Sequence, residues 1–205
     1  MNAEENPVRH TGSFGETVTY VKRYTSSAAM WQEWQALNEC RGPGIQRAIS
    51  IDPEAQSLTL AFEPAAVPLS SFGKADLRLL IAVLPAIVSV IQHCHDRGWV
   101  HGDIKPSNML YVPATQTIRL IDFGASHRIG TSREALSEWQ ATPMFASPQQ
   151  MSGEGLVHTG DDWYALMKII DQVMPLVHDR LLRRTIRGVR AGVVADFQYS
   201  ERTIR

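Results

Sequence analysis

Eight residues near the middle of the chain combine side chains that suit phosphoryl transfer. The stretch "HGDIKPSN", residues 101–108, contains Asp103, Lys105 and Asn108. Asp103 could orient a hydroxyl group and accept its proton, and Lys105 could neutralise the transferring phosphoryl group. Asn108 offers a neutral oxygen of the kind that Mg²⁺ binds. Taken alone, a D-x-K-x-x-N pattern more often marks a polar turn whose aspartate caps backbone N–H groups.

A second acidic segment follows nineteen residues after Asp103, where Asp122 stands in "IDFG". The residues between form two short apolar runs, 109–112 and 117–122, around the turn "PATQ", which predicts a β-hairpin. Asp122 ends the second strand, so its carboxylate could approach a metal from the side opposite Asn108. The two segments at this spacing favour a phosphoryl-transfer site over two unrelated turns.

The pair "HGDIKPSN" and "DFG" resembles the catalytic and magnesium-binding loops of eukaryotic-type (Hanks-type) Ser/Thr protein kinases. The glycine after His101 also occurs in aminoglycoside phosphotransferases, which leaves a small-molecule acceptor open. Residues 141–149, "ATPMFASPQ", resemble the end of a protein kinase activation segment, here 122–148. In the family, the threonine at the position of Thr142 contacts the catalytic aspartate and lysine.

The resemblance extends to "DDWYAL", residues 161–166, which is similar to the start of the central helix of the kinase C-lobe. It implies that Asp162 binds backbone N–H groups of the catalytic loop. A helix N-cap is the plain alternative for this aspartate, and both roles are compatible.

The N-terminal part supplies the expected nucleotide site. Lys22 in "TYVKRY" resembles the strand lysine that binds the α and β phosphates, and Glu33 its helix partner. The segment "FEPA" resembles the hinge, with Phe62 at the back of the adenine pocket and the backbone of Glu63 and Ala65 binding the base. The cofactors implied are ATP and Mg²⁺, with Asn108 and Asp122 as the metal ligands.

Three departures from the family pattern are visible. The segment "TGSFGETV" has two of the three loop glycines and ends too close to Lys22 for a further strand, so we expect a hairpin turn leading directly into the lysine strand. Gly102 replaces an arginine that meets a loop phosphate, so activity should not need loop phosphorylation in the usual way. Gln149 replaces a glutamate. The short C-terminal part predicts a reduced docking platform and reliance on a partner protein for substrate choice.

The pattern of elements predicts an α+β, bilobal kinase-like fold with a reduced N-lobe, 1–66, and a truncated, mainly helical C-lobe, 67–205. A linker is expected at 63–71. Asp76 is the expected N-cap of the next helix, and Pro85 should kink or split it. The strands are expected at 17–24, 45–51, 57–62, 109–112 and 117–122, and the helices at 28–40, 75–97, 162–174 and 179–190.

The composition limits the kinds of partner that we expect the protein to bind. The 205 residues carry a formal net charge of −1, which gives no basic field for nucleic acid. The apolar run 79–91 is too short for a membrane span and suits a core helix. The N-terminus lacks an apolar signal segment, so a cytoplasmic location is expected, with export without a cleaved signal left open. Sixteen arginines against four lysines hint at a bacterial source.

Three functions are compatible with these residues. An ATP-dependent kinase acting on protein Ser/Thr hydroxyls explains the full set of polar residues. A pseudokinase that serves as a binding module would explain the short glycine loop and Gln149. A small-molecule kinase would explain "HGD" but not "TPMFASP".

Overall fold

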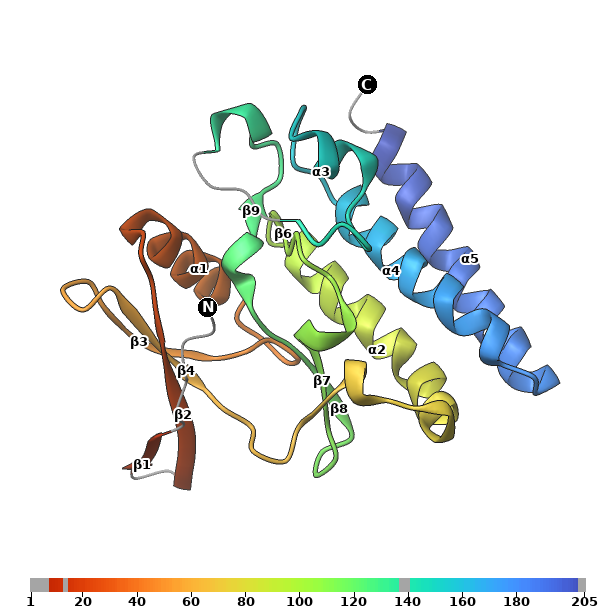
Figure 1. Ribbon diagram of the computed structural model, residues 1–205, viewed down its shortest axis with the longest axis horizontal. Helices are drawn as coiled ribbons and strands as arrows, with labels where there is room; N and C mark the ends of the chain where they lie inside the picture. The colour runs from red at the N-terminus through yellow and green to blue at the C-terminus, as the bar shows by residue number, and fades with distance from the viewer. Residues whose placement is uncertain (1–7, 13–14, 137–140, 203–205) are drawn as a thin grey trace.

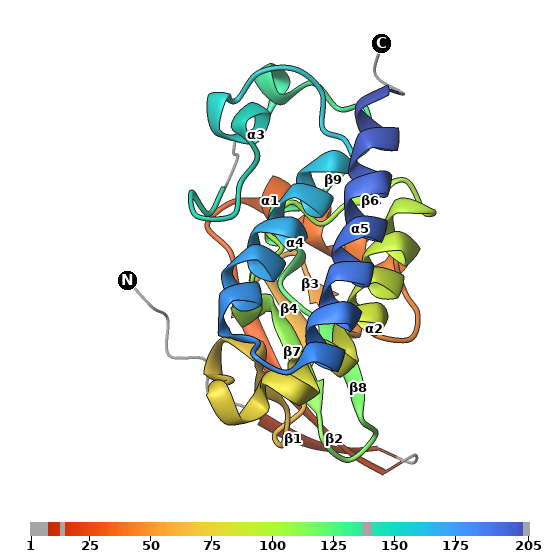
Figure 2. The same ribbon diagram turned by 90° about the vertical axis from the view of Figure 1, so that its right-hand side faces the viewer.

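The computed structural model describes residues 8–12, 15–136 and 141–202 (Figure 1). A four-stranded sheet with helix α1 occupies one half of the molecule in Figure 1, and α2, α4 and α5 run side by side in the other. The hairpin of β7 and β8 lies between them. The view in Figure 2 shows the same three helices packed next to one another, with α5 on the outside.

The sheet is antiparallel with strand order β1-β2-β4-β3. Its strands are β1 (Val8–Gly12), β2 (Gly15–Arg23), β3 (Ala48–Asp52) and β4 (Ser57–Ala61). Gly12 pairs with Gly15 across the β1–β2 turn, and β2 continues to Lys22. The expected hairpin leading directly into the lysine strand is therefore confirmed, although Ser13 and Phe14 of its turn lie outside the described residues.

Helix α1 (Ser27–Glu39) follows β2. Its N-cap is Ser26, whose hydroxyl accepts a hydrogen bond from the Ala29 N–H at 3.3 Å, as is usual for serine at this position. The helix buries Met30, Ala36 and Leu37 in the core together with one charged residue, Glu33. A buried carboxylate requires a partner, and the site below supplies it.

The helical half is built on α2 (Leu77–His95), α4 (Gly160–Val173) and α5 (Arg180–Arg202), with the short α3 (Pro148–Ser152). The strands β5 (Val67–Pro68), β7 (Met109–Val112) and β8 (Thr117–Leu120) form one small sheet, and β6 (Trp99–Val100) pairs with β9 (His127–Arg128). Side chains from both halves join one apolar core.

Three expectations about elements need correction. Pro85 does not split α2, since it lies on the exposed side of the helix while the opposite side is held in the core. Asp76 is the N-cap residue of α2, as expected, but its side chain makes no capping hydrogen bond to this helix; its carboxylate accepts from the Gly73 N–H at 2.8 Å and closes a preceding 3₁₀ turn. The last helix ends at Arg202, not near Arg190.

Residues Lys74–His95, which include α2, are long and apolar enough to cross a membrane by length and composition. In the fold this helix has eight buried side chains and packs against α5 and β8. It therefore serves as the core helix that the apolar run predicted.

Candidate active site

The catalytic loop and Thr142 bring four of the predicted side chains into one hydrogen-bonded group. The Lys105 ammonium lies 2.7 Å from Asp103 Oδ2, and the Thr142 hydroxyl donates to Asp103 Oδ1 at 2.6 Å. Lys105 also donates to the Thr142 hydroxyl at 3.3 Å. Asn108 Nδ2 donates to the carbonyl oxygen of Asp103 at 3.0 Å and to its Oδ2 at 3.1 Å. A carboxylate oriented in this way can accept a proton from an incoming hydroxyl.

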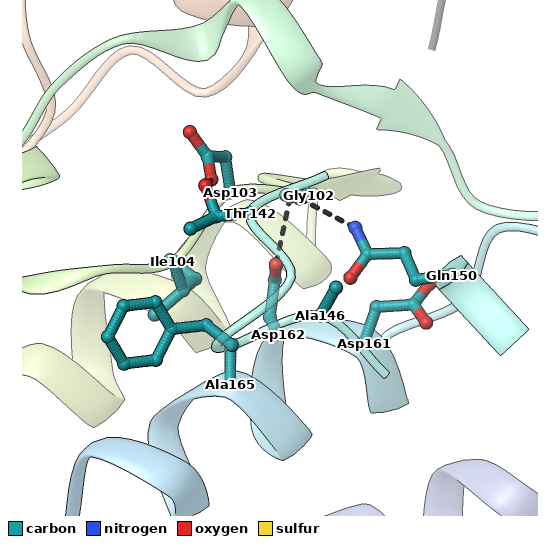
Figure 3. Close-up of a pocket in the computed structure, with 10 residues that line it drawn as sticks. Gly102, Asp103, Ile104, Thr142, Ala146, Gln150, Asp161, Asp162 and Ala165 are labelled. Carbon is teal, nitrogen blue, oxygen red and sulfur yellow. Dashed lines mark hydrogen bonds between the residues drawn. The ribbon is translucent and has the colours of Figure 1, made fainter. Parts of the chain in front are cut away.

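Asp162, near the start of α4, fixes the backbone of this loop from below. Its Oδ2 accepts from the His101 N–H at 2.8 Å and its Oδ1 from the Gly102 N–H at 2.9 Å. Figure 3 shows Asp162 pointing to Gly102. The side chain of His95 lies 2.9 Å from Oδ2. Complete burial would raise the pKa of Asp162, but the contacts with His95, His101 and Gly102 lower it, so the carboxylate is charged.

Lys22 joins two carboxylates from other elements. Its ammonium lies 2.9 Å from Glu33 Oε2 on α1 and 2.7 Å from Asp122 Oδ1 beyond β8. Burial would lower the pKa of Lys22, but Glu33 and Asp122 raise it above its ordinary value. Burial also acts to raise the pKa of Asp122, but Lys22 lowers it. Lys22 and Asp122 are therefore both ionised at neutral pH, and the Lys22 ammonium lies between the side chains of Glu33 and Asp122.

Asp122 lies two residues beyond the end of β8, not on the strand as expected, and has a φ of 62°. The Ile121 N–H donates to the Asn108 carbonyl at 3.0 Å, so Asn108 and Asp122 flank the same open end of the β7–β8 hairpin. Asp122 Oδ1 is bound by Lys22, and its side chain is 45% exposed. The amide oxygen of Asn108 and the carboxylate of Asp122 thus lie on either side of the open end of the hairpin.

The described residues contain no group of three or more His, Cys, Asp or Glu side chains placed to hold a metal ion. Mg²⁺ does not need such a group, because it usually binds one or two protein oxygens together with substrate phosphates. Asn108 and Asp122 fit that pattern.

A cavity of about 310 Å³ opens beside the hinge. This volume is in the range of small-molecule sites. Phe62 and Glu63 line it, as expected, but Ala65 is exposed and its neighbour Ala66 lines the cavity instead. Tyr20 also lines it and meets the Phe62 ring edge-on, with ring centres 6.3 Å apart.

Sequence reasoning missed two tyrosines near Lys22. The Tyr24 hydroxyl donates to Glu33 Oε2 at 2.8 Å, and Tyr20 lines the hinge cavity. The sequence did contain a signal for them. Tyr20 and Tyr24 each stand two positions from Lys22, and residues two apart along an extended chain point to the same side.

The reasoning also missed Arg133 and Gln150. Arg133 forms a buried ion pair with Asp161, and Gln150 Nε2 donates to the Gly102 carbonyl at 2.6 Å. No local pattern marks either residue, since their partners lie far away in the sequence.

Comparisons with known proteins agree with this geometry. Residues 17–178 match the model of the protein kinase domain. Cell division control protein 2 homolog 1 of Trypanosoma brucei brucei is 26% identical over 127 residues, which cover 60% of this chain and 42% of that protein. Serine/threonine-protein kinase PEPKR2 of Arabidopsis thaliana is 36% identical over 98 residues, 46% of this chain and 20% of that protein. The chain thus spans less than half the length of these relatives.

The fold comparison gives the same result. The structure of the Cydia pomonella Granulovirus kinase PK-1 matches with a TM-score of 0.60 and 19% sequence identity, over 79% of this chain and 60% of that one. The predicted α+β kinase-like fold, reduced in size, is confirmed. Because the domain match covers most of the sequence, the chain belongs to the protein kinase family, of the Hanks type.

Proposed function

We propose that this protein kinase transfers the γ-phosphoryl group of ATP to serine and threonine hydroxyls of proteins. The observation that carries the proposal is the hydrogen-bonded group of Asp103, Lys105 and Thr142. These three side chains combine a proton acceptor, a cation and a hydroxyl at one point of the surface, and Asp103 keeps 11% of its side chain exposed.

In this proposal Asp103 accepts the proton of the substrate hydroxyl as that oxygen attacks phosphorus. Lys105 offsets the charge that develops on the transferring group. Thr142 orients Asp103 through its hydroxyl and leaves the other carboxylate oxygen to Lys105 and Asn108. Asp162 holds the loop backbone, so that the Asp103 carboxylate keeps its direction.

The donor side of the site rests on Lys22, Glu33 and Asp122. Lys22 would bind phosphate oxygens and is held in place by Glu33. Asn108 and Asp122 would hold Mg²⁺, which would offset phosphate charge during phosphoryl transfer. The adenine base would occupy the cavity beside Phe62, next to Glu63 and Ala66, which line it in place of the expected Ala65. The division into lobes at residues 66 and 67 stays a prediction, as does a partner protein that selects substrates.

The test is transfer from γ-labelled ATP with Mg²⁺ to a generic basic protein. Asp103→Asn removes the proton acceptor without changing shape, and transfer should fall by roughly 100-fold or more. Asp52→Asn is the matched control, because Asp52 is the exposed last residue of β3, where its carboxylate accepts from the Ala55 N–H in the following turn at 2.9 Å.

Label on the protein substrate that depends on Asp103 supports the proposal. Binding of ATP without transfer to serine or threonine would overturn it in favour of a binding module. Transfer to a small hydroxyl compound alone would favour the small-molecule kinase instead.

A further inference from the structure

Arg133 is a buried arginine in the activation segment. Only 4% of the residue is exposed, and its Nη2 is paired with Asp161 Oδ2 at the start of α4. Its Nη1 donates to the carbonyl oxygens of Glu154 at 3.1 Å and Leu156 at 2.5 Å. A buried guanidinium is tolerated only where its charge and its N–H groups are satisfied, and here one carboxylate and two carbonyl groups do so.

The carboxylate of Asp161 extends this contact toward the catalytic loop. The Ser147 hydroxyl donates to Asp161 Oδ1 at 2.7 Å, and the same hydroxyl accepts from the Gln150 N–H at 3.0 Å. Gln150 Nε2 then donates to the Gly102 carbonyl at 2.6 Å. Figure 3 shows the Gln150 amide directed at Gly102, with Asp161 beside it.

Hydrogen bonds therefore hold both peptide groups of Gly102. Its N–H donates to Asp162, and its carbonyl accepts from Gln150. Asp103 is the next residue, so a shift of the Gly102 peptide would turn the proposed proton acceptor. The chain of contacts from Arg133 to Gly102 links the activation segment to the orientation of Asp103.

The backbone excludes an arginine at position 102. Gly102 has a φ of 79°, and a Cβ atom built there would lie 2.4 Å from the Ala125 carbonyl oxygen. Position 102 therefore cannot supply a cation to the activation segment, whereas Arg133 is a buried cation within that segment and is paired with Asp161.

We propose that Arg133 is a positioning residue, which holds the activation segment and the Gly102 peptide in their working arrangement through Asp161, Ser147 and Gln150 without phosphorylation of the segment. The expected change in kcat rests on the proposed function. The expected change in amide hydrogen exchange rests on the contacts alone. Because the contact partner is a carboxylate of the chain itself, the arrangement is present as soon as the chain folds.

The first test uses the full chain after phosphatase treatment, with intact mass as proof that no phosphate remains. The phosphate-free wild type should transfer at full rate, and Arg133→Met should lower kcat by roughly tenfold, or ~1.4 kcal/mol of barrier, while KM for ATP stays the same. Arg190→Met is the matched control, since it removes an exposed ion pair with Asp171 on the far helix. A wild type that gains tenfold or more from phosphorylation of its segment overturns the proposal.

A double variant separates positioning from stability. Arg133→Met with Asp161→Leu removes both buried charges, and such replacements often restore stability. If the pair only stabilises the fold, the double variant regains kcat together with its melting temperature, and the proposal fails. If the pair positions the loop, the melting temperature recovers and kcat stays low.

Gln150→Leu gives an independent readout if Arg133 variants do not fold. It removes the bond to the Gly102 carbonyl together with the longer bond that Gln150 Oε1 accepts from the Ser147 N–H at 3.3 Å, and amide hydrogen exchange near residues 101–104 should accelerate. Unchanged exchange and unchanged kcat in this variant contradict the proposal. Exchange is measured without ATP, so a kinase that transfers nothing refutes the proposed function, whereas exchange still decides whether the contacts hold the loop.

Discussion

Lys22 and Asp122 lie 100 residues apart in the sequence, and their side chains meet at 2.7 Å. Lys22 also contacts Glu33, so β2, α1 and the segment that follows β8 converge on one ammonium group. The contact ties the four-stranded sheet to the hairpin that leads to the catalytic loop. The same ammonium therefore contributes both to folding and to the proposed donor site.

Replacement of Lys22 by methionine should remove activity and weaken the fold. Glu33 is fully buried and would lose its cation, which costs about 3 kcal/mol for a buried pair broken on one side. Transfer from ATP should fall by roughly 100-fold or more, because a charge-stabilising donor is lost. Urea unfolding and kcat/KM for ATP measure the two effects.

Lys74→Met is the control for Lys22→Met, because Lys74 is exposed and lies away from the site. It should change neither quantity. An active Lys22→Met enzyme with wild-type kcat/KM would remove Lys22 from the proposed donor site.

Tyr24→Phe tests the second partner of Glu33. The Tyr24 hydroxyl donates to Glu33 at 2.8 Å, and a hydrogen bond to a charged group contributes about 1.5–3 kcal/mol. The free energy of unfolding should fall by that amount, with the ring packing retained. Tyr164→Phe is the control, since Tyr164 contacts Phe197 and Lys168 of the described residues through its ring. Equal stability of the two variants would show that the hydroxyl of Tyr24 adds nothing.

The residues that sequence reasoning found share one property: the chemistry limits both their type and their spacing. Asp103, Lys105 and Asn108 lie within one loop, and a hairpin brings Asp122 next to them, so local rules were sufficient. Arg133 differs in this respect. Nothing near it in the sequence distinguishes it from fifteen other arginines, and its burial depends on Asp161, 28 residues away.

The end of α5 shows a second limit of local reasoning. The helix was expected to end at residue 190, and Gly188 and Gly192 lower the helix propensity of this segment. The helix continues because Ile186, Val189, Val193 and Phe197 follow a helical period and pack on the core. Burial of that apolar face stabilises the helix by more than the two glycines destabilise it. Helix propensities summed along the sequence do not include this packing energy.

Acid should destabilise the protein through Asp122 and Asp162. Both carboxyl groups have a pKa below the ordinary 3.8, Asp122 because Lys22 outweighs its burial and Asp162 because His95 and the loop N–H groups do so. The folded state then binds fewer protons than the unfolded state. The stability that these two carboxylates contribute is therefore fully present above pH 3.8 and is lost as the pH falls through their lowered pKa values. Urea unfolding at a series of pH values between about 6 and 2 measures the loss.

Asp122→Asn measures how much the Asp122 carboxylate contributes to the loss of stability in acid. Asparagine does not titrate, so the stability difference between wild type and variant should shrink as the pH falls below 3.8. A difference that stays constant down to pH 2 would contradict the lowered pKa of Asp122.

Gly102 and Gly155 offer a matched pair for the catalytic loop. Their φ angles are 79° and 75°, but a Cβ at Gly155 meets nothing within 4 Å, whereas one at Gly102 lies 2.4 Å from the Ala125 carbonyl oxygen. Gly155→Ala should cost only the left-handed backbone penalty of about 1–2 kcal/mol. Gly102→Ala should cost clearly more, because the Ala125 backbone must move as well.

The two alanine variants should also differ in activity. Displacement of the Gly102 peptide breaks its bonds to Asp162 and Gln150 and turns Asp103, so kcat should fall in Gly102→Ala and stay at the wild-type value in Gly155→Ala. Urea unfolding and steady-state transfer assays on both proteins check this. Equal losses of stability in the two variants would mean that the loop yields to the added methyl group, and that its tight contact with Ala125 does not fix the direction of Asp103.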